Sequence, residues 1–266
     1  PRRNNKCGVR AILDDSLQWV CLFHAARSAR EVIMQLLVAT SNPGKRREFA
    51  MMLSDLFVEE VEFIDMASWP EPLPDVIEDR DTFLGNAVKK AVETSRNAGI
   101  SAMSEDSGLA VDALDGAPGV YSARFAGEPR DDAANNRLLI ERLAALPDAP
   151  RTARYVATIC LALVPGDPLG DLLIARLEAR SPRVDGIPTK PGTPGAVEDR
   201  VVAWWRGEME GEIIDEARGD GGFGYDPHFL VPEWGKTNAE VPAEQKNSVS
   251  HRARALRAMA ASLAKS

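Results

Sequence analysis

The sequence Ser104-Glu105-Asp106-Ser107-Gly108-Leu109 follows an apolar segment, Ile100 to Met103, and it decides how the rest of the chain is interpreted. The apolar segment is typical of a buried strand, and we expect this strand to end in a tight turn that carries the two adjacent carboxylates. Buried carboxylates without partners are costly. A divalent cation such as Mg²⁺ removes that cost, since it binds carboxylate oxygens together with water and substrate phosphates. The alternative is an acidic surface turn, because Asp-Ser-Gly is common in turns.

The composition restricts the class of protein. The chain has 266 residues, of which 44% are hydrophobic and 27% are charged, and these values are typical of a globular protein with a sizeable core. The net charge of −8 argues against general nucleic-acid binding, which needs a basic face, but not against a nucleotide ligand. No apolar run approaches the length of a membrane span. Three cysteines without metal-binding spacing (Cys7, Cys21 and Cys160) predict a reducing, cytoplasmic location.

Residues 1–34 differ from the rest of the chain. They carry six basic and three acidic side chains, and their apolar cluster, Trp19 to Phe23, is short and follows Asp14-Asp15. This pattern suits neither a secretory signal nor a membrane helix. We therefore expect residues 1–34 to lie outside the fold, as a disordered leader or as sequence that is not normally translated, and residues 35–266 to form one domain.

Strands and helices alternate from Gln35 onward, which indicates an α/β protein. Leu36 to Ala39 is typical of a strand buried on both faces, and apolar residues at helical spacing begin at Phe49. Between them lies the polar turn Thr40 to Lys45. Its helix-start N–H groups and the lysine ammonium could hold a phosphate. A purely structural turn would use the same Asn-Pro-Gly residues, and without further context that interpretation is the better one.

Later segments predict more elements and one interruption. Residues 165–200 contain six prolines with interspersed glycines, and we expect an irregular insertion there, such as a lid or an interaction loop. The turn-like segment Gly207 to Gly211 separates two predicted strands. The remaining predicted strands cover 61–64, 155–164, 201–205, 213–214 and 229–231, and the remaining helices end at Gly99, cover 138–146 and begin near Val249.

Six motifs in one order resemble the inosine/xanthosine triphosphate pyrophosphatases, which remove non-canonical purine nucleotides. Each motif alone is weakly specific, but their order over more than two hundred residues is highly specific. The similarity extends from Gln35 to the C-terminus. The motifs are Ala39 to Lys45, Phe83 to Ala87, Glu105 to Leu109, Gly116 to Arg124, Gly221 to Pro227 and Ser250 to Arg252.

The resemblance implies a fold and an activity. The fold would be an elongated, curved mixed β-sheet flanked by helices, with two lobes and a central nucleotide cleft. The enzyme would use Mg²⁺ to hydrolyse ITP, dITP and XTP to the monophosphate and pyrophosphate, by water attack at the α-phosphate. It would act on the nucleotide pool as a cytoplasmic homodimer, with neither a nucleic-acid nor a membrane partner.

The same resemblance implies roles for individual residues. Asp106 matches the position of the catalytic base, although the sequence does not separate that role from metal binding. Mg²⁺ would be bound by Glu78, Glu105 and Asp106. The expected substrate-binding residues are Thr40, Ser41, Asn42, Pro43, Gly44, Lys45, Ser107, Phe223, Gly224, Tyr225, Asp226, Lys246, His251 and Arg252.

Several of these residues also have simpler interpretations. Phe223 and Tyr225 alternate as core aromatics would, and His251 could cap a helix. As base-binding groups, Lys246, His251 and Arg252 could donate to the 6-oxygen of hypoxanthine or xanthine and leave the amino group of adenine unpaired. Competing functions are a pyrophosphatase of the Maf type and a non-catalytic nucleotide-binding module.

Overall fold

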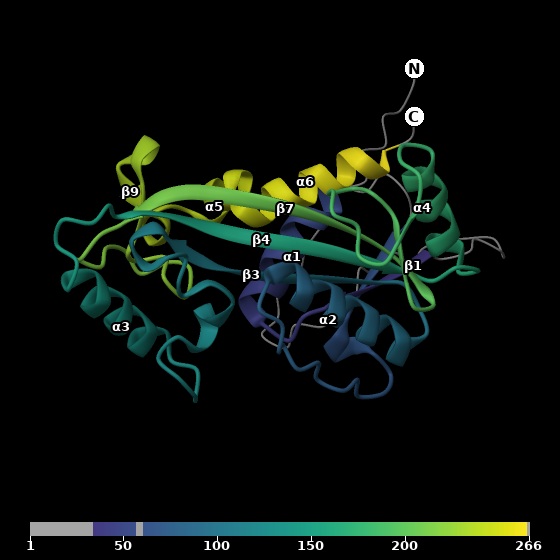
Figure 1. Ribbon diagram of the computed structural model, residues 1–266, viewed down its shortest axis with the longest axis horizontal. Helices are drawn as coiled ribbons and strands as arrows, with labels where there is room; N and C mark the ends of the chain where they lie inside the picture. The colour runs from purple at the N-terminus through teal and green to yellow at the C-terminus, as the bar shows by residue number, and fades with distance from the viewer. Residues whose placement is uncertain (1–33, 57–60, 265–266) are drawn as a thin grey trace, which may run out of the picture. The chain divides into compact units, whose positions relative to one another are not determined.

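The computed structural model describes residues 34–56 and 61–264, which lie within one compact unit, Val32–Ser266 (Figure 1). The predicted leader, residues 1–34, lies outside the described residues except for its last residue. Met34 is the first residue of strand β1 (Met34–Ala39) and therefore belongs to the sheet.

The described residues form a mixed sheet in which β1 is parallel to both of its neighbours, β2 and β3. Strands β3, β4 and β7 are long, and β4 is antiparallel to both β3 and β7. The strand order is β2-β1-β3-β4-β7-β6-β5, and β8 joins β7 to β9. The remaining bounds are β2 (Val61–Asp65), β3 (Ala102–Val111), β4 (Thr152–Leu163), β5 (Val184–Asp185), β6 (Gly195–Val197), β7 (Arg200–Ile213), β8 (Phe229–Val231) and β9 (Lys236–Thr237).

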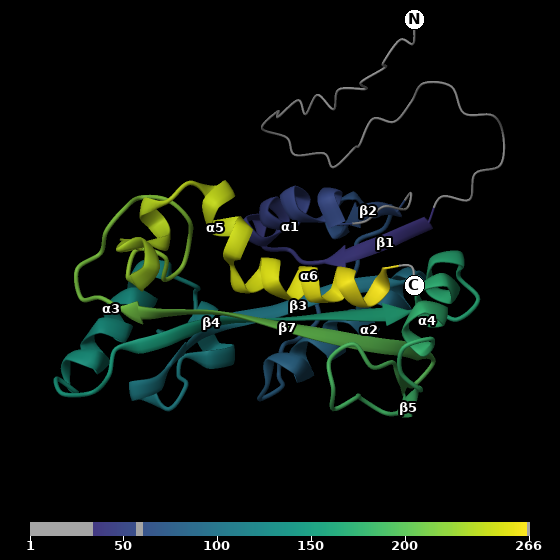
Figure 2. The ribbon, with the colours of Figure 1, turned by 90° about the horizontal axis from the view of Figure 1, so that it is seen from above.

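Helices cover both faces of this sheet, as predicted. Helix α6 packs on β7 and β4, and α2 packs on β3 and β4 from the opposite side (Figures 1 and 2). Side chains of β4 alternate between the faces, so Ile159 and Leu161 join the core under α6 while Cys160 joins the core under α2. The helices are α1 (Pro43–Leu56), α2 (Phe83–Ala98), α3 (Asp132–Ala144), α4 (Pro168–Glu178), α5 (Ala243–Val249) and α6 (His251–Leu263).

A second large core lies around α3 at the other ends of the long strands. It contains residues of β3, β4, β7 and β8, such as Leu109, Tyr155, Met209 and Phe229. The long strands therefore run through both cores and connect them. This arrangement confirms the predicted α/β class with a mixed sheet flanked by helices.

Two predicted turns are wrong, because both segments continue as strands. Glu105 and Asp106 lie in the middle of β3, because this strand continues to Val111. Likewise, Gly207 to Gly211 lies inside the continuous strand β7. A Cβ at Gly207 would stand 2.1 Å from the carbonyl oxygen of His251. Glycine there allows α6 to approach the strand closely and does not mark a turn.

The segment 165–200 is also more regular than predicted. Asp167 caps helix α4 by accepting from the Gly170 N–H, and Pro168 occupies the first turn. Proline is favoured at a helix start, where its missing N–H costs nothing. Leu173 and Leu177 of α4 are buried in the core under α6, so this part of the segment belongs to the fold.

The helix predicted from about Val249 is confirmed as α6, and α5 is a short helix before it that the sequence analysis did not predict. Ser250 separates α5 from α6, and its hydroxyl accepts from the Ala253 N–H at 3.2 Å. An N-capping serine is a standard helix start. The predicted end of α2 is confirmed, since Gly99 ends this helix in the left-handed conformation, and Thr82 caps its start.

Candidate active site

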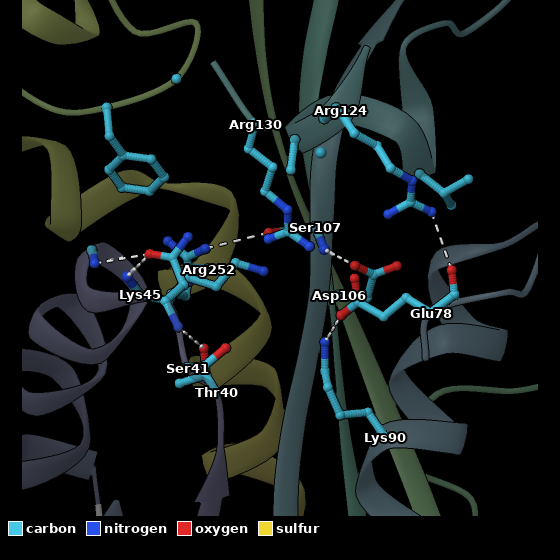
Figure 3. A pocket seen from close by; sticks show the side chains of 18 of the residues that line it. Thr40, Ser41, Lys45, Glu78, Lys90, Asp106, Ser107, Arg124, Arg130 and Arg252 are labelled. Atoms are coloured by element: carbon cyan, nitrogen blue, oxygen red, sulfur yellow. Dashed lines mark hydrogen bonds and ion pairs between the residues drawn. The ribbon is translucent and has the colours of Figure 1, made fainter. Parts of the chain in front are cut away.

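A cleft of about 960 Å³ gathers most of the residues that the sequence singled out (Figure 3). Its walls come from the β1–α1 connection, the segment before α2, strand β3, the short helix Gly119–Arg124, the loop before β8, and the start of α6. The volume is at the upper end of the range of small-molecule sites. Of the predicted site residues, Pro43 and Glu105 are the two that do not line it.

The β1–α1 connection is organised by Asn42. Its side-chain oxygen accepts from the N–H groups of Gly44, at 2.8 Å, and Lys45, at 3.1 Å. Asn42 thus caps α1, and two of the helix-start N–H groups predicted to hold phosphate already have a partner. The cations and hydroxyls of this wall are therefore the groups that face the cleft, with Thr40, Ser41 and Lys45 among its lining.

Asp106 and Glu78 form an acidic pair across one end of the cleft (Figure 3). Asp106 accepts from the Asn86 side-chain amide at 3.1 Å. Burial raises the pKa of Asp106, and the nearby charge of Glu78 raises it further, against the opposing effects of Lys45 and Lys90. The Asp106 carboxylate is therefore the more basic of the two.

Glu78 is held by cations. Lys90 on α2 pairs with its carboxylate, and the Arg124 guanidinium donates to its backbone carbonyl at 3.1 Å. Burial favours a higher pKa for Glu78, but Lys90, Lys45 and Arg130 outweigh it and bring the pKa below the usual value. Glu78 therefore stays ionised opposite Asp106.

Glu105 points away from this pair into a buried ion-pair network. One of its oxygens, Oε1, accepts from Nε and Nη2 of Arg252, at 3.0 and 2.8 Å. The other, Oε2, lies 3.1 Å from Nζ of Lys45. Burial alone would raise the pKa of Glu105, but Arg252 and Lys45 hold it well below its usual range. Among the described residues, no three Asp, Glu, His or Cys side chains converge as a metal site.

The network continues through Glu48, which the sequence analysis missed. Glu48 on α1 pairs with Arg252, and its Oε1 lies 3.3 Å from Nζ of Lys246. Lys246 in turn lies 2.7 Å from Asp226. We call these six alternating charges the buried network: Asp226, Lys246, Glu48, Arg252, Glu105 and Lys45. The sequence contains one indication of this role for Glu48, since it lies one helical turn after Lys45 and next to the apolar Phe49.

The cleft lining also includes an aromatic ring, that of Phe223. Phe223 is 37% exposed, and Nζ of Lys246 lies 4.8 Å from the centre of its ring. A Cβ at Gly44 would stand 3.1 Å from this ring, so the β1–α1 connection passes directly beside it. Tyr225 is more deeply placed, because it belongs to the core around α3 and its hydroxyl donates to the Ser122 carbonyl at 2.8 Å.

Asp226 and His251 are fixed by their surroundings. Asp226 Oδ2 accepts from the Phe223 N–H at 2.9 Å, and a Cβ at Gly222 would stand 2.1 Å from this oxygen. His251 stacks on Tyr155 with ring centres 5.0 Å apart. Burial lowers the pKa of His251 well below its usual value, and the Arg252 charge adds to this effect, so the ring is neutral. The cap of α6 is Ser250 and not His251.

Further cations line the cleft that the sequence analysis did not assign. They are Arg47, Lys90, Arg124 and Arg130. Lys90 could have been found, because it lies four residues after Asn86 and thus on the same side of α2. Arg130 has no comparable signal in the sequence, since it lies between the recognised motifs.

The fold is a mixed α/β sheet, and its cleft combines clustered cations, two facing carboxylates and an exposed aromatic ring. These features define a class of enzyme that acts on phosphorylated ligands carrying a ring. The chain belongs to the Ham1 family, whose model matches residues 36–171 and 193–262. The family model does not match residues 172–192, which lie within the segment 165–200 where the sequence predicts an insertion. No helix among the described residues has the length and hydrophobicity to cross a membrane.

Relatives and solved structures agree with this membership. A dITP/XTP pyrophosphatase of Desulforamulus reducens is 41% identical over 84% of this chain and 92% of its own length. One of Geobacter sulfurreducens is 42% identical over the same shares. The structure of a HAM1 protein from Coxiella burnetii is 33% identical, covers 86% of this chain and 98% of its own, and has a TM-score of 0.67. The Staphylococcus aureus Ham1 protein has a TM-score of 0.63 at 31% identity, covering 85% of this chain and 96% of its own.

Proposed function

We propose that this protein hydrolyses dITP, XTP and ITP to the monophosphate and pyrophosphate. Its relatives are named dITP/XTP pyrophosphatases. The observation that carries the proposal is one cleft whose lining combines Asp106 and Glu78 with Lys45 and the exposed ring of Phe223. A nucleoside triphosphate has the matching parts, a ring that can stack on an aromatic side chain and phosphates that pair with cations and metal ligands.

Asp106 is the group we assign to the attacking water. Its raised pKa makes the carboxylate a better proton acceptor, so it can orient the water and take its proton. Lys45 and Lys90 are held by Glu105 and Glu78, which fixes their positions beside the reacting phosphates. Positioned cations stabilise the charge that develops during phosphoryl transfer.

Mg²⁺ fits Glu78 and Asp106. Both present hard oxygen donors, and the buried Asp106 carboxylate, whose pKa is raised, would be stabilised by a cation. When bound, the ion would neutralise charge on the pyrophosphate leaving group. Both oxygens of Glu105 already face Arg252 or Lys45, so we assign Glu105 to holding these cations rather than the metal.

For recognition of the base we propose Lys246 as the principal donor. Its ammonium lies over the Phe223 ring, where a stacked purine would place its edge, and it can donate to a 6-oxo group. Arg252 is 1% exposed and lies between Glu48 and Glu105. We therefore assign Arg252 to stabilising the wall of the cleft rather than to direct contact with the base.

The test is a nucleotide panel with product analysis. The protein would be incubated with Mg²⁺ and ITP, dITP, XTP, GTP, ATP or dTTP, and monophosphate, pyrophosphate and orthophosphate would be measured. Preference for the first three nucleotides, with pyrophosphate as the product, is expected. Preference for dTTP or another pyrimidine, release of orthophosphate, or absence of turnover by a folded protein would refute the proposal.

We also propose that the enzyme is a cytoplasmic homodimer. Light scattering after gel filtration would measure the mass in solution, and about twice the chain mass of 28.9 kDa is expected. A monomeric mass at enzyme concentrations used in assays would contradict the dimer.

A further inference from the structure

Arg130 is a cation in the cleft that the buried network does not use. It lies on the segment before α3, and Figure 3 shows its side chain extending into the cleft toward the space between Arg252 and Asp106. It is exposed, and no hydrogen bond or ion pair joins it to any residue in the described ranges. Its charge reaches Glu78, whose pKa it helps to lower.

Most of the other cations in the cleft are already engaged. Lys45 faces Glu105, Lys90 faces Glu78, and Lys246 faces Asp226. Arg252 and Arg124 also have acceptors within the protein. Seven basic residues line the cleft together with six acidic ones, so its charges nearly cancel. A phosphate chain therefore gains most from a cation that has no partner yet, because no existing pair must be broken.

The backbone around Arg130 is fixed although its side chain is free. Asp131 caps α3 by accepting from the Ala134 N–H at 3.0 Å. Asp132 accepts from the Gly224 N–H at 2.8 Å, which ties the same segment to the loop that carries Phe223. Arg130 is thus held at a constant place on the cleft wall, with a guanidinium that can turn toward a ligand.

We propose that Arg130 is a phosphate-binding residue, which contacts the phosphate chain of the substrate from the wall opposite Lys45. A planar guanidinium can bind phosphate oxygens through two parallel N–H groups, which makes arginine well suited to this contact. This inference rests on the proposed function for the identity of the substrate, but not for the contact with phosphate itself.

The experiment compares Arg130→Ala with Arg130→Lys and with a control, Arg137→Ala. Arg137 is an exposed arginine on α3 that does not line the cleft. Binding of inorganic tripolyphosphate, the phosphate chain without a nucleoside, would be measured by calorimetry at one fixed Mg²⁺ concentration. Steady-state kinetics with dITP would give KM and kcat, and circular dichroism would check that each variant folds.

We expect Arg130→Ala to weaken tripolyphosphate binding about tenfold, the usual scale for one charged hydrogen bond at an exposed site. KM for dITP should rise by a similar factor while kcat changes by less than about threefold, because the contact is made before and during the reaction. Arg130→Lys should lie between wild type and Arg130→Ala, since it keeps the charge but loses the two-pronged geometry. Arg137→Ala should match the wild type.

Tripolyphosphate binding within twofold of wild type in Arg130→Ala, or an equal loss in Arg137→Ala, would overturn the assignment. If the wild-type protein hydrolyses no nucleotide, the proposed function fails, yet the tripolyphosphate comparison still decides whether Arg130 binds phosphate. If dITP is hydrolysed equally well by wild type and Arg130→Ala and tripolyphosphate binding is unchanged, the function stands and the role of Arg130 is refuted.

Discussion

Replacing Glu48 by alanine should destabilise the protein strongly, because Glu48 is the central acid of the buried network. Its side chain is 11% exposed and lies between Arg252 and Lys246, which are 1% and 6% exposed. The network contains three acids and three bases, so removing Glu48 leaves an uncompensated positive charge away from water. The two cations on either side of it then repel each other without an acid between them.

The magnitude follows from the geometry. Opposite unit charges separated by 3.3 Å, as Oε1 of Glu48 and Nζ of Lys246 are, attract by about 5 kcal/mol at an effective dielectric constant of about 20. Part of this is offset by the desolvation that folding has already imposed on both groups. Removing one partner of a buried ion pair lowers the free energy of unfolding by about 3–5 kcal/mol, and we expect a loss of about 3–4 kcal/mol for Glu48→Ala. Glu48→Gln keeps the shape and one acceptor, so about 2 kcal/mol is expected.

Urea unfolding followed by tryptophan fluorescence would measure this loss, because Trp205 is buried in β7 beside α6. Circular dichroism should give the same midpoint, which would justify a two-state treatment. Glu141→Ala on the exposed side of α3 serves as the matched control and should stay within about 0.5 kcal/mol of wild type. Lys246→Met combined with Glu48→Gln restores the balance of charge and should cost at least about 1 kcal/mol less than the sum of the single variants.

A loss below about 1 kcal/mol for Glu48→Ala, or additive effects in the double variant, would refute the reasoning. Either result would mean that Lys246 and Arg252 are stable without an acid between them. Turnover of dITP should fall in Glu48→Ala as well, since both cations line the cleft. A stability loss without any change in turnover would show that the network supports the fold but not the site.

Three further predictions test other parts of the structure. Asp106→Asn should lower turnover at least about a hundredfold. The melting temperature should stay equal or rise, because burial raises the Asp106 pKa and the ionised carboxylate therefore destabilises the fold above that pKa. Near-normal turnover would remove Asp106 from the mechanism. Gly108→Ala should lower the free energy of unfolding in urea by about 2 kcal/mol, because its Cβ would stand 2.4 Å from the Gly119 carbonyl oxygen and 2.4 Å from Ser122 Oγ. An unchanged urea midpoint would show that the short helix Gly119–Arg124 can move aside. Leu173→Ala should lower the free energy of unfolding by about 3 kcal/mol, because the Leu173 side chain is 1% exposed. Val184 lies in the same segment but is 41% exposed, so Val184→Ala should lower it by less than about 0.5 kcal/mol. Equal effects would mean that α4 does not belong to the core.

Sequence patterns of short range were sufficient for much of the fold and for the candidate site. The apolar run at Leu36 to Ala39 and the terminal Gly99 each act within a few residues, and each lies where it was predicted. The order of the motifs was sufficient for the family. Short-range patterns failed where a glycine or proline serves a distant contact, as Gly207 does for α6.

The sequence by itself determined the α/β class, the family and many of the residues that gather at the cleft, because these depend on local propensity and on motifs that persist as linear order. Only the tertiary structure decided how the charges are shared. Glu48 and Arg252 are 204 residues apart in the chain, yet they form one pair in the buried network. Glu48 and Glu105 therefore hold cations within the buried network, as the contact of Glu105 with Lys45 shows. Glu78 and Asp106 instead line the cleft. Carboxylates are chemically alike in a sequence, and only their surroundings in three dimensions distinguish their roles.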